Sequence, residues 1–81
     1  MGRSQLIGLK GSEVWAYVVD LGDGLRLQLT LDDWERLNLY RGKRIPVRMA
    51  GREDCWLYVV GAVEHPPLVW LTLAVRVRAA G

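Results

Sequence analysis

The chain has 81 residues, a formal net charge of +2 and a single cysteine, Cys55. A chain of this length corresponds to one small domain, so we expect residues 1–81 to form one β-barrel-like unit with a modest core. A disulfide within the chain is excluded. A closed structural zinc site needs four ligands, whereas the only soft ligands here are His65 and Cys55. With 51% hydrophobic residues, the chain has enough apolar surface to gain support from oligomerisation, and we expect a homo-oligomer, with a dimer favoured.

No segment has the features of a signal peptide or of a membrane span. The first ten residues lack the apolar stretch of a secretory signal. The longest apolar stretches, Cys55–Val63 and Leu68–Val75, are far shorter than the roughly 20 residues that cross a bilayer as a helix. We therefore expect a cytoplasmic protein without a membrane partner.

Alternation of apolar and polar residues dominates the sequence. In Leu25–Leu31, for example, four leucines lie on one face and Arg26, Gln28 and Thr30 on the other. A period of two over five to seven residues is typical of half-buried strands. The predicted strands lie near residues 5–10, 13–20, 25–31, 44–49, 55–63 and 68–78.

One segment breaks the alternation and predicts a short helix. Thr30 is a suitable N-cap, and two acids follow it in the first turn, where the helix dipole favours them. Apolar residues then recur at intervals of three, and Gly42 supplies a C-terminal stop. We predict a helix over about 31–40 that follows the preceding strand directly and covers one end of the sheet.

The pattern Trp-x-Tyr-Val-Val occurs twice, at Trp15–Val19 and at Trp56–Val60. Each copy follows a glycine-containing turn and precedes a strand with Leu-Thr-Leu, so each half of the chain is predicted to be a three-stranded meander. Whether the copies reflect duplication or chance similarity between two β segments stays open. Two meanders that bury their apolar faces together predict a mainly β fold, a six-stranded barrel or a tight sandwich in the size range of SH3-like and OB-like modules. Such a fold carries no function by itself.

The direction of the aromatic side chains depends on the hairpin at residues 21–24. A loop of two or four residues places Val18 opposite Leu29, with Trp15 and Tyr17 outward, whereas a three-residue loop turns both rings onto the leucines. We favour the first arrangement, because a narrow barrel has little room for large rings. A patch repeated on an identical chain is self-complementary. The predicted partner or dimer face comprises Trp15, Tyr17, Trp56, Tyr58 and Trp70.

The basic residues are nine arginines and two lysines. Arginine favours planar contacts with phosphate, although a GC-rich genome also encodes arginine in preference to lysine. If the outward arginines lie on neighbouring strands with aromatic rings between them, they suit single-stranded nucleic acid; the alternative is an ordinary solvated surface. The predicted nucleic-acid face comprises Arg26, Arg44, Arg48, Arg76 and Arg78.

The sequence contains no recognisable catalytic, cofactor-binding or metal site. His65 lies in a predicted loop, and Cys55 is expected to be a packed structural thiol. The acids Asp32, Asp33 and Glu35 are explained by the start of the helix. We therefore predict a non-enzymatic interaction module that associates with itself or with a protein partner. The alternative is a nucleic-acid-binding barrel, and an enzyme assembled across an oligomer has no support from any residue.

Overall fold

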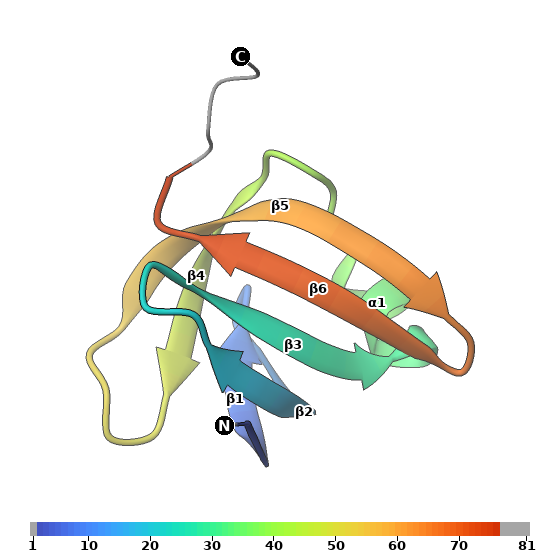
Figure 1. The fold of residues 1–81 in the computed structure, drawn as a ribbon, viewed down its shortest axis with the longest axis horizontal. Coiled ribbons are helices and arrows are strands. Elements are labelled where there is room, and N and C mark those ends of the chain that lie inside the picture. The colour runs from blue at the N-terminus through green and yellow to red at the C-terminus, as the bar shows by residue number, and fades with distance from the viewer. Residues whose placement is uncertain (1, 77–81) are drawn as a thin grey trace.

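The computed structural model describes residues 2–76, which form six antiparallel strands and one short helix (Figure 1). No helix within these residues is long and apolar enough to cross a membrane. The elements are β1 (Arg3–Leu9), β2 (Ser12–Asp20), β3 (Gly24–Thr30), α1 (Leu31–Leu37), β4 (Arg44–Met49), β5 (Cys55–His65) and β6 (Leu68–Ala74).

The strands form a closed barrel in the order β1-β2-β3-β6-β5-β4. Strands β1 to β3 and strands β4 to β6 are two meanders of antiparallel neighbours, linked by α1. Two seams join the meanders: β3 pairs with β6 along its whole length, and β1 pairs with β4 over Ile7–Leu9. The structure confirms the predicted mainly β fold with six strands and one helix, and it selects the barrel over the sandwich.

The two copies of Trp-x-Tyr-Val-Val occupy β2 and β5, the middle strands of the two meanders. In both copies the residue between Trp and Tyr is buried, Ala16 in β2 and Leu57 in β5, while the tryptophan is exposed. Two strands separate β2 from β5 in either direction around the ring. The two copies therefore lie on opposite sides of the barrel.

The β2–β3 hairpin has a tight turn. Gly22 adopts a φ of +89°, a conformation that favours glycine. The N–H of Leu21 donates to the carbonyl of Gly24 at 2.9 Å, which leaves only Gly22 and Asp23 at the tip. This turn determines which residues of β2 and β3 face each other.

The observed register pairs Val18 with Leu27, not with Leu29 as predicted. The difference is two residues, so the inward and outward faces of β2 are unchanged. The small residues of β2 point inward, as favoured from the sequence, and the buried ones are Val14, Ala16 and Val18.

The inward side chains form one apolar core, and no polar residue among those described is buried in it. The β3–β6 seam supplies its centre, because apolar residues on these strands pair directly. Burying one such side chain contributes roughly 1.5–3 kcal/mol. The pairs are Leu25 with Leu73, Leu27 with Leu71, and Leu29 with Val69.

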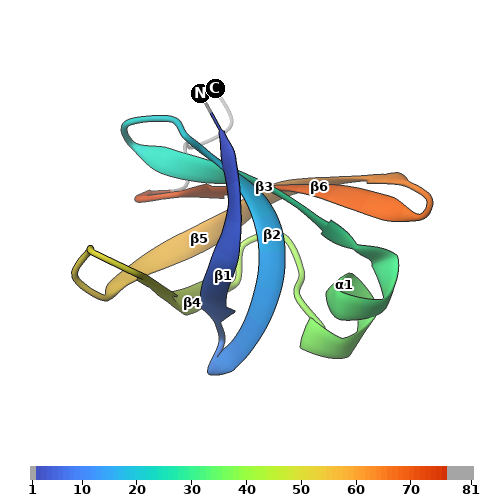
Figure 2. The ribbon, with the colours of Figure 1, turned by 90° about the horizontal axis from the view of Figure 1, so that it is seen from below.

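Helix α1 closes one end of the barrel and is shorter than predicted (Figure 2). It begins directly after β3, and the Thr30 hydroxyl accepts a hydrogen bond from the Asp33 N–H at 3.2 Å. Asn38 adopts a left-handed conformation with φ +51°, so the helix ends at Leu37. Asparagine tolerates this conformation better than most residues, and it ends the helix before Gly42 is reached.

Gly24 lies where β3 and β6 approach closely. A Cβ atom at this position would come within 2.9 Å of the Ala74 Cα and closer still to the carbonyl oxygen of Leu73. Because these are backbone atoms, they cannot move aside as a side chain would. We expect Gly24→Ala to lower the free energy of unfolding by about 1–3 kcal/mol, as measured by urea denaturation followed by circular dichroism.

Gly61→Ala is the matched control. Gly61 also lies in a strand, but a Cβ atom there would meet no heavy atom within 4 Å. Both substitutions restrict the unfolded chain equally, so Gly61→Ala should be neutral or stabilise the protein by up to about 1 kcal/mol. Equal destabilisation by the two variants would contradict the close packing at the β3–β6 seam.

Candidate functional site

Exposed aromatic residues gather on two sides of the barrel. The β2 face comprises Leu6, Trp15, Tyr17, Val63 and Trp70, and the β5 face comprises Lys10, Tyr40, Lys43, Arg44, Trp56 and Tyr58. The structure thus divides the predicted aromatic face. It brings together Trp15, Tyr17 and Trp70, and it places Trp56 and Tyr58 on the other side.

The β2 face is a continuous apolar band. Leu6 of β1 pairs directly with Trp15 of β2, and their side chains are 54% and 61% exposed. Tyr17 packs edge-to-face against Trp70 of β6, with ring centroids 6.3 Å apart. Trp70 pairs in turn with Val63 of β5. The band therefore extends from β1 across the barrel to β5.

Opposite charges lie at the two ends of this face. Glu13 is exposed at the start of β2, two positions before Trp15. At the other end, Arg26 of β3 pairs with Val19, and its guanidinium lies 5.2 Å from the centre of the Trp70 ring. Between these two residues the β2 face is uncharged.

The β5 face combines rings with cations. The Arg44 guanidinium lies 4.9 Å from the centre of the Trp56 ring, and the Lys43 ammonium lies 4.9 Å from that of Tyr40. Both distances are within the range of cation–π attraction. Trp56 is 53% exposed and Tyr40 60% exposed, so both rings remain accessible to a ligand.

Lys10 places a second ammonium group beside Lys43. Its Nζ donates to the carbonyl of Leu37 at the end of α1, at 3.1 Å. Interaction with the neighbouring Lys43 and partial desolvation together lower the pKa of Lys10. The backbone N–H of Lys10 also donates to the Pro46 carbonyl at 3.1 Å, and Pro46 pairs with Trp56. Lys10 is therefore hydrogen-bonded both to the end of α1 and to β4, the strand that carries Arg44.

The predicted arginine face is not assembled. Arg26 borders the β2 face, Arg44 belongs to the β5 face, and Arg76 follows the end of β6. Arg48 is held by Asp54 through Nε at 3.2 Å and Nη2 at 2.9 Å. Arg78 lies outside the described residues. Arg26 comes from β3, and Arg44 and Arg48 come from β4 on the opposite side of the ring, which alternation along single strands does not reveal.

Sequence reasoning also missed residues of both faces. Leu6 and Val63 were not predicted as part of the dimer face, because their role depends on strand pairing. Lys10, Tyr40 and Lys43 were not predicted as part of a basic face. A signal for the last two was present, since Tyr40–Arg44 has three cations in five residues and no acid.

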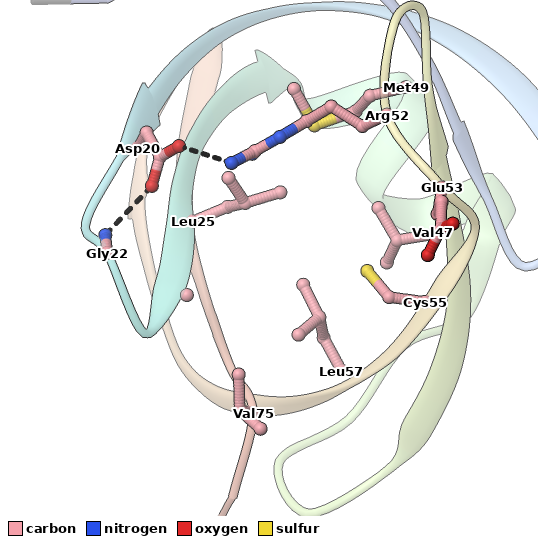
Figure 3. A pocket seen from close by; sticks show the side chains of 11 residues that line it. Asp20, Gly22, Leu25, Val47, Met49, Arg52, Glu53, Cys55, Leu57 and Val75 are labelled. Carbon is pink, nitrogen blue, oxygen red and sulfur yellow. Dashed lines mark hydrogen bonds and ion pairs between the residues drawn. The ribbon is translucent and has the colours of Figure 1, made fainter.

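A pocket of about 320 Å³ opens at the barrel end where β3 begins (Figure 3). An ion pair between Asp20 and Arg52, at 2.8 Å, crosses its rim. The Cys55 thiol is exposed at this mouth (Figure 3), so the prediction of a packed thiol is wrong. The side chain reaches solvent because β5 begins at Cys55, before the barrel wall closes over it.

The pocket does not bring Cys55 and His65 together. Cys55 and His65 begin and end β5, a separation of roughly 30 Å along an extended strand. A thiol and an imidazole at this separation cannot act on one substrate as nucleophile and base. Within residues 2–76, no group of three or more His, Cys, Asp or Glu side chains is placed to hold a metal ion.

Comparison with known proteins assigns no family to the chain. No family model, curated protein or solved structure matches it. Function is therefore inferred from the chemistry of the two faces.

Two exposed carboxylates, Asp20 and Asp54, make the free energy of unfolding depend on pH. The hydrogen bond from the Gly22 N–H, with the charge of Arg52, holds the pKa of Asp20 below its usual range. The hydrogen bond and charge of Arg48 do the same for the pKa of Asp54. A carboxyl group whose pKa is lowered by folding stabilises the protein above its unfolded pKa of about 3.9. This stabilisation is lost as the pH falls through the folded-state pKa.

Asp54→Asn should therefore lower the urea midpoint at about pH 7 but not at an acidic pH below the folded-state pKa of Asp54, where the wild-type carboxyl group is itself protonated. Arg48→Gln serves as the control background, because it removes the main cause of the lowered pKa of Asp54. In that background, Asp54→Asn should have little further effect at either pH. An effect of Asp54→Asn that is independent of pH would contradict the ion pair as its cause.

Proposed function

We propose that the protein is a non-enzymatic interaction module that self-associates through its β2 face as a two-fold symmetric dimer. The observation that carries the proposal is the directly paired Leu6 and Trp15, both more than half exposed. Contiguous apolar patches on a protein surface mark interaction sites. Removing such surface from water stabilises a complex by about 25 cal/mol per Å² before the costs of association.

The charges at the ends of the β2 face favour a second copy as the partner. A two-fold axis that lies in the interface and runs across the line from Glu13 to Arg26 reverses that line, so each end meets the opposite end of the other chain. With the axis near the centre of the face, Glu13 of one protomer lies beside the partner's Arg26. Opposite charges at the rim set the register of association. The centre is uncharged, so its burial leaves no unpaired charge inside the interface.

The size of the face favours a weak dimer. A standard interface buries about 800 Å² on each partner, and a single aromatic side chain contributes at most about 150–250 Å². Trp15, Tyr17 and Leu6 therefore form the centre, and Ser4, the polar neighbour of Tyr17 on β1, belongs to the rim. We expect such a small interface to be weak, with a dissociation constant on the order of micromolar.

Trp15→Ala should raise the dimer dissociation constant about tenfold or more, because tryptophan is the usual anchor of such interfaces. Sedimentation velocity over about 5 to 500 µM protein measures this change in affinity. The matched control is Trp56→Ala, which removes the equivalent exposed tryptophan of the second repeat on the opposite side of the barrel. It should leave the dissociation constant unchanged.

A wild-type protein that stays monomeric throughout this range would overturn the proposal. An equal loss of association in Trp15→Ala and Trp56→Ala would also overturn it, because the β2 face would then have no special role.

Charge reversal tests the two-fold arrangement. Glu13→Arg and Arg26→Glu should each weaken the dimer, since like charges then meet at the rim. The double variant restores opposite charges across the axis and should recover most of the affinity. Its dissociation constant is compared by sedimentation with those of the two single variants. Losses that simply add in the double variant would show that these residues do not meet across the axis.

A further inference from the structure

We propose that the β5 face binds single-stranded nucleic acid, with its rings stacking on unpaired bases and its cations contacting phosphates. This surface lies on the opposite side of the barrel from the β2 face. It is therefore available to a ligand in the monomer and in the proposed dimer. The inference does not depend on self-association.

The exposed rings provide stacking surfaces. Trp56 and Tyr40 are each more than half exposed, and each is already stacked with a cation at 4.9 Å. A cation over one side of a ring holds the side chain in place and leaves other parts of the ring open. Bases stack on such aromatic side chains with little sequence preference, because every base has a π face.

The paired ammonium groups provide an anion-binding point. Lys10 and Lys43 are close enough to interact directly, and their mutual repulsion favours loss of a proton from Lys10. No carboxylate within residues 2–76 is among the groups that shift the pKa of Lys10. A bound phosphate relieves this repulsion, because its charge interacts favourably with both ammonium groups.

Among the described residues, the cations of the β5 face are not held by carboxylates, unlike three arginines elsewhere on the barrel. Arg36, Arg48 and Arg52 form salt bridges with Asp33, Asp54 and Asp20, respectively. In the part of the chain that the structure describes, Lys10, Lys43 and Arg44 form no salt bridge. Their charge is therefore available to an external anion.

Backbone hydrogen bonds hold the face in position. The Gly42 N–H donates to the Val59 carbonyl at 2.7 Å, and the Val59 N–H donates to the Lys43 carbonyl at 2.8 Å. The loop that carries Tyr40 and Lys43 is thus attached to β5, the strand that carries Trp56. A preorganised surface loses less conformational entropy when it binds a ligand.

A single strand fits these features better than a duplex or an acidic protein. A duplex offers phosphates, but its bases are stacked on one another and do not reach exposed rings. An acidic segment of a protein would neutralise the lysines and leave the indole and phenol rings without a flat partner. Of these three ligands, the unpaired strand alone supplies both phosphates and free base faces.

Binding is measured by fluorescence anisotropy with the full chain and labelled oligonucleotides of about 12 nucleotides. Oligothymidylate and oligouridylate are used separately, so that DNA and RNA can be distinguished as the source of the strand. A duplex of the same length should bind about tenfold more weakly than the tighter of these two. Titrations between about 50 and 200 mM salt should show affinity falling as salt rises.

Each substitution in the β5 face has a matched control on the other side of the barrel. Trp56→Ala should weaken binding about tenfold, while Trp15→Ala should not. Arg44→Ala should lower the slope of log affinity against log salt by about 0.7, the value for one phosphate contact on a single strand. Arg26→Ala removes the equivalent arginine–tryptophan pair beside the β2 face and should leave the slope unchanged.

Circular dichroism and the urea midpoint of each variant establish that it is folded. The proposal is overturned if wild-type protein binds neither single strand at low salt. It is also overturned if the duplex binds as tightly as the single strands, or if Trp15→Ala weakens binding as much as Trp56→Ala. Because Trp15→Ala is expected to weaken the dimer and still bind the strand, failure of the dimer proposal and failure of this one are distinguishable.

Discussion

The pairing of β3 with β6 is the interaction on which the rest of the barrel depends. It joins the two meanders along a whole strand, whereas the opposite seam between β1 and β4 covers only Ile7–Leu9. Leucine and valine side chains fill the space inside it. Gly24 allows the two backbones to approach closely. Because the interior is filled by these aliphatic side chains, the large rings of the middle strands must point outward.

The side chains that surround the outward rings differ between the two middle strands. In β2, Trp15 lies beside Leu6 and Tyr17 beside Trp70, so that copy of the repeat is part of an apolar surface. In β5, Trp56 lies beside Arg44, and the loop after α1 adds further cations. Two similar strand sequences thus display two different surfaces on opposite sides of one scaffold. This difference is the basis for proposing self-association on one side and nucleic-acid binding on the other.

Much of the fold could be predicted from local patterns. Period-two alternation located the strands, and the N-cap at Thr30 located the start of the helix. Errors arose where a competing local preference prevailed. Asn38 ended the helix before Gly42, and a tight turn at Gly22 shifted the β2–β3 register by two residues. The shift preserved the inward face, because side chains in a strand repeat with a period of two.

The sequence by itself determined the strands and the single helix, since these features depend on neighbours within a few residues. It favoured an outward direction for Trp15 and Trp56, but the hairpin register decided which face of each strand points outward. Only the tertiary structure decided which outward side chains share a surface. It separated the two tryptophans, divided the arginines among different sides of the barrel and brought Lys10 next to Lys43. Such neighbours depend on the order of strands around the ring and on the path of the loop after α1. Both are set by closure of the barrel, which no local pattern encodes.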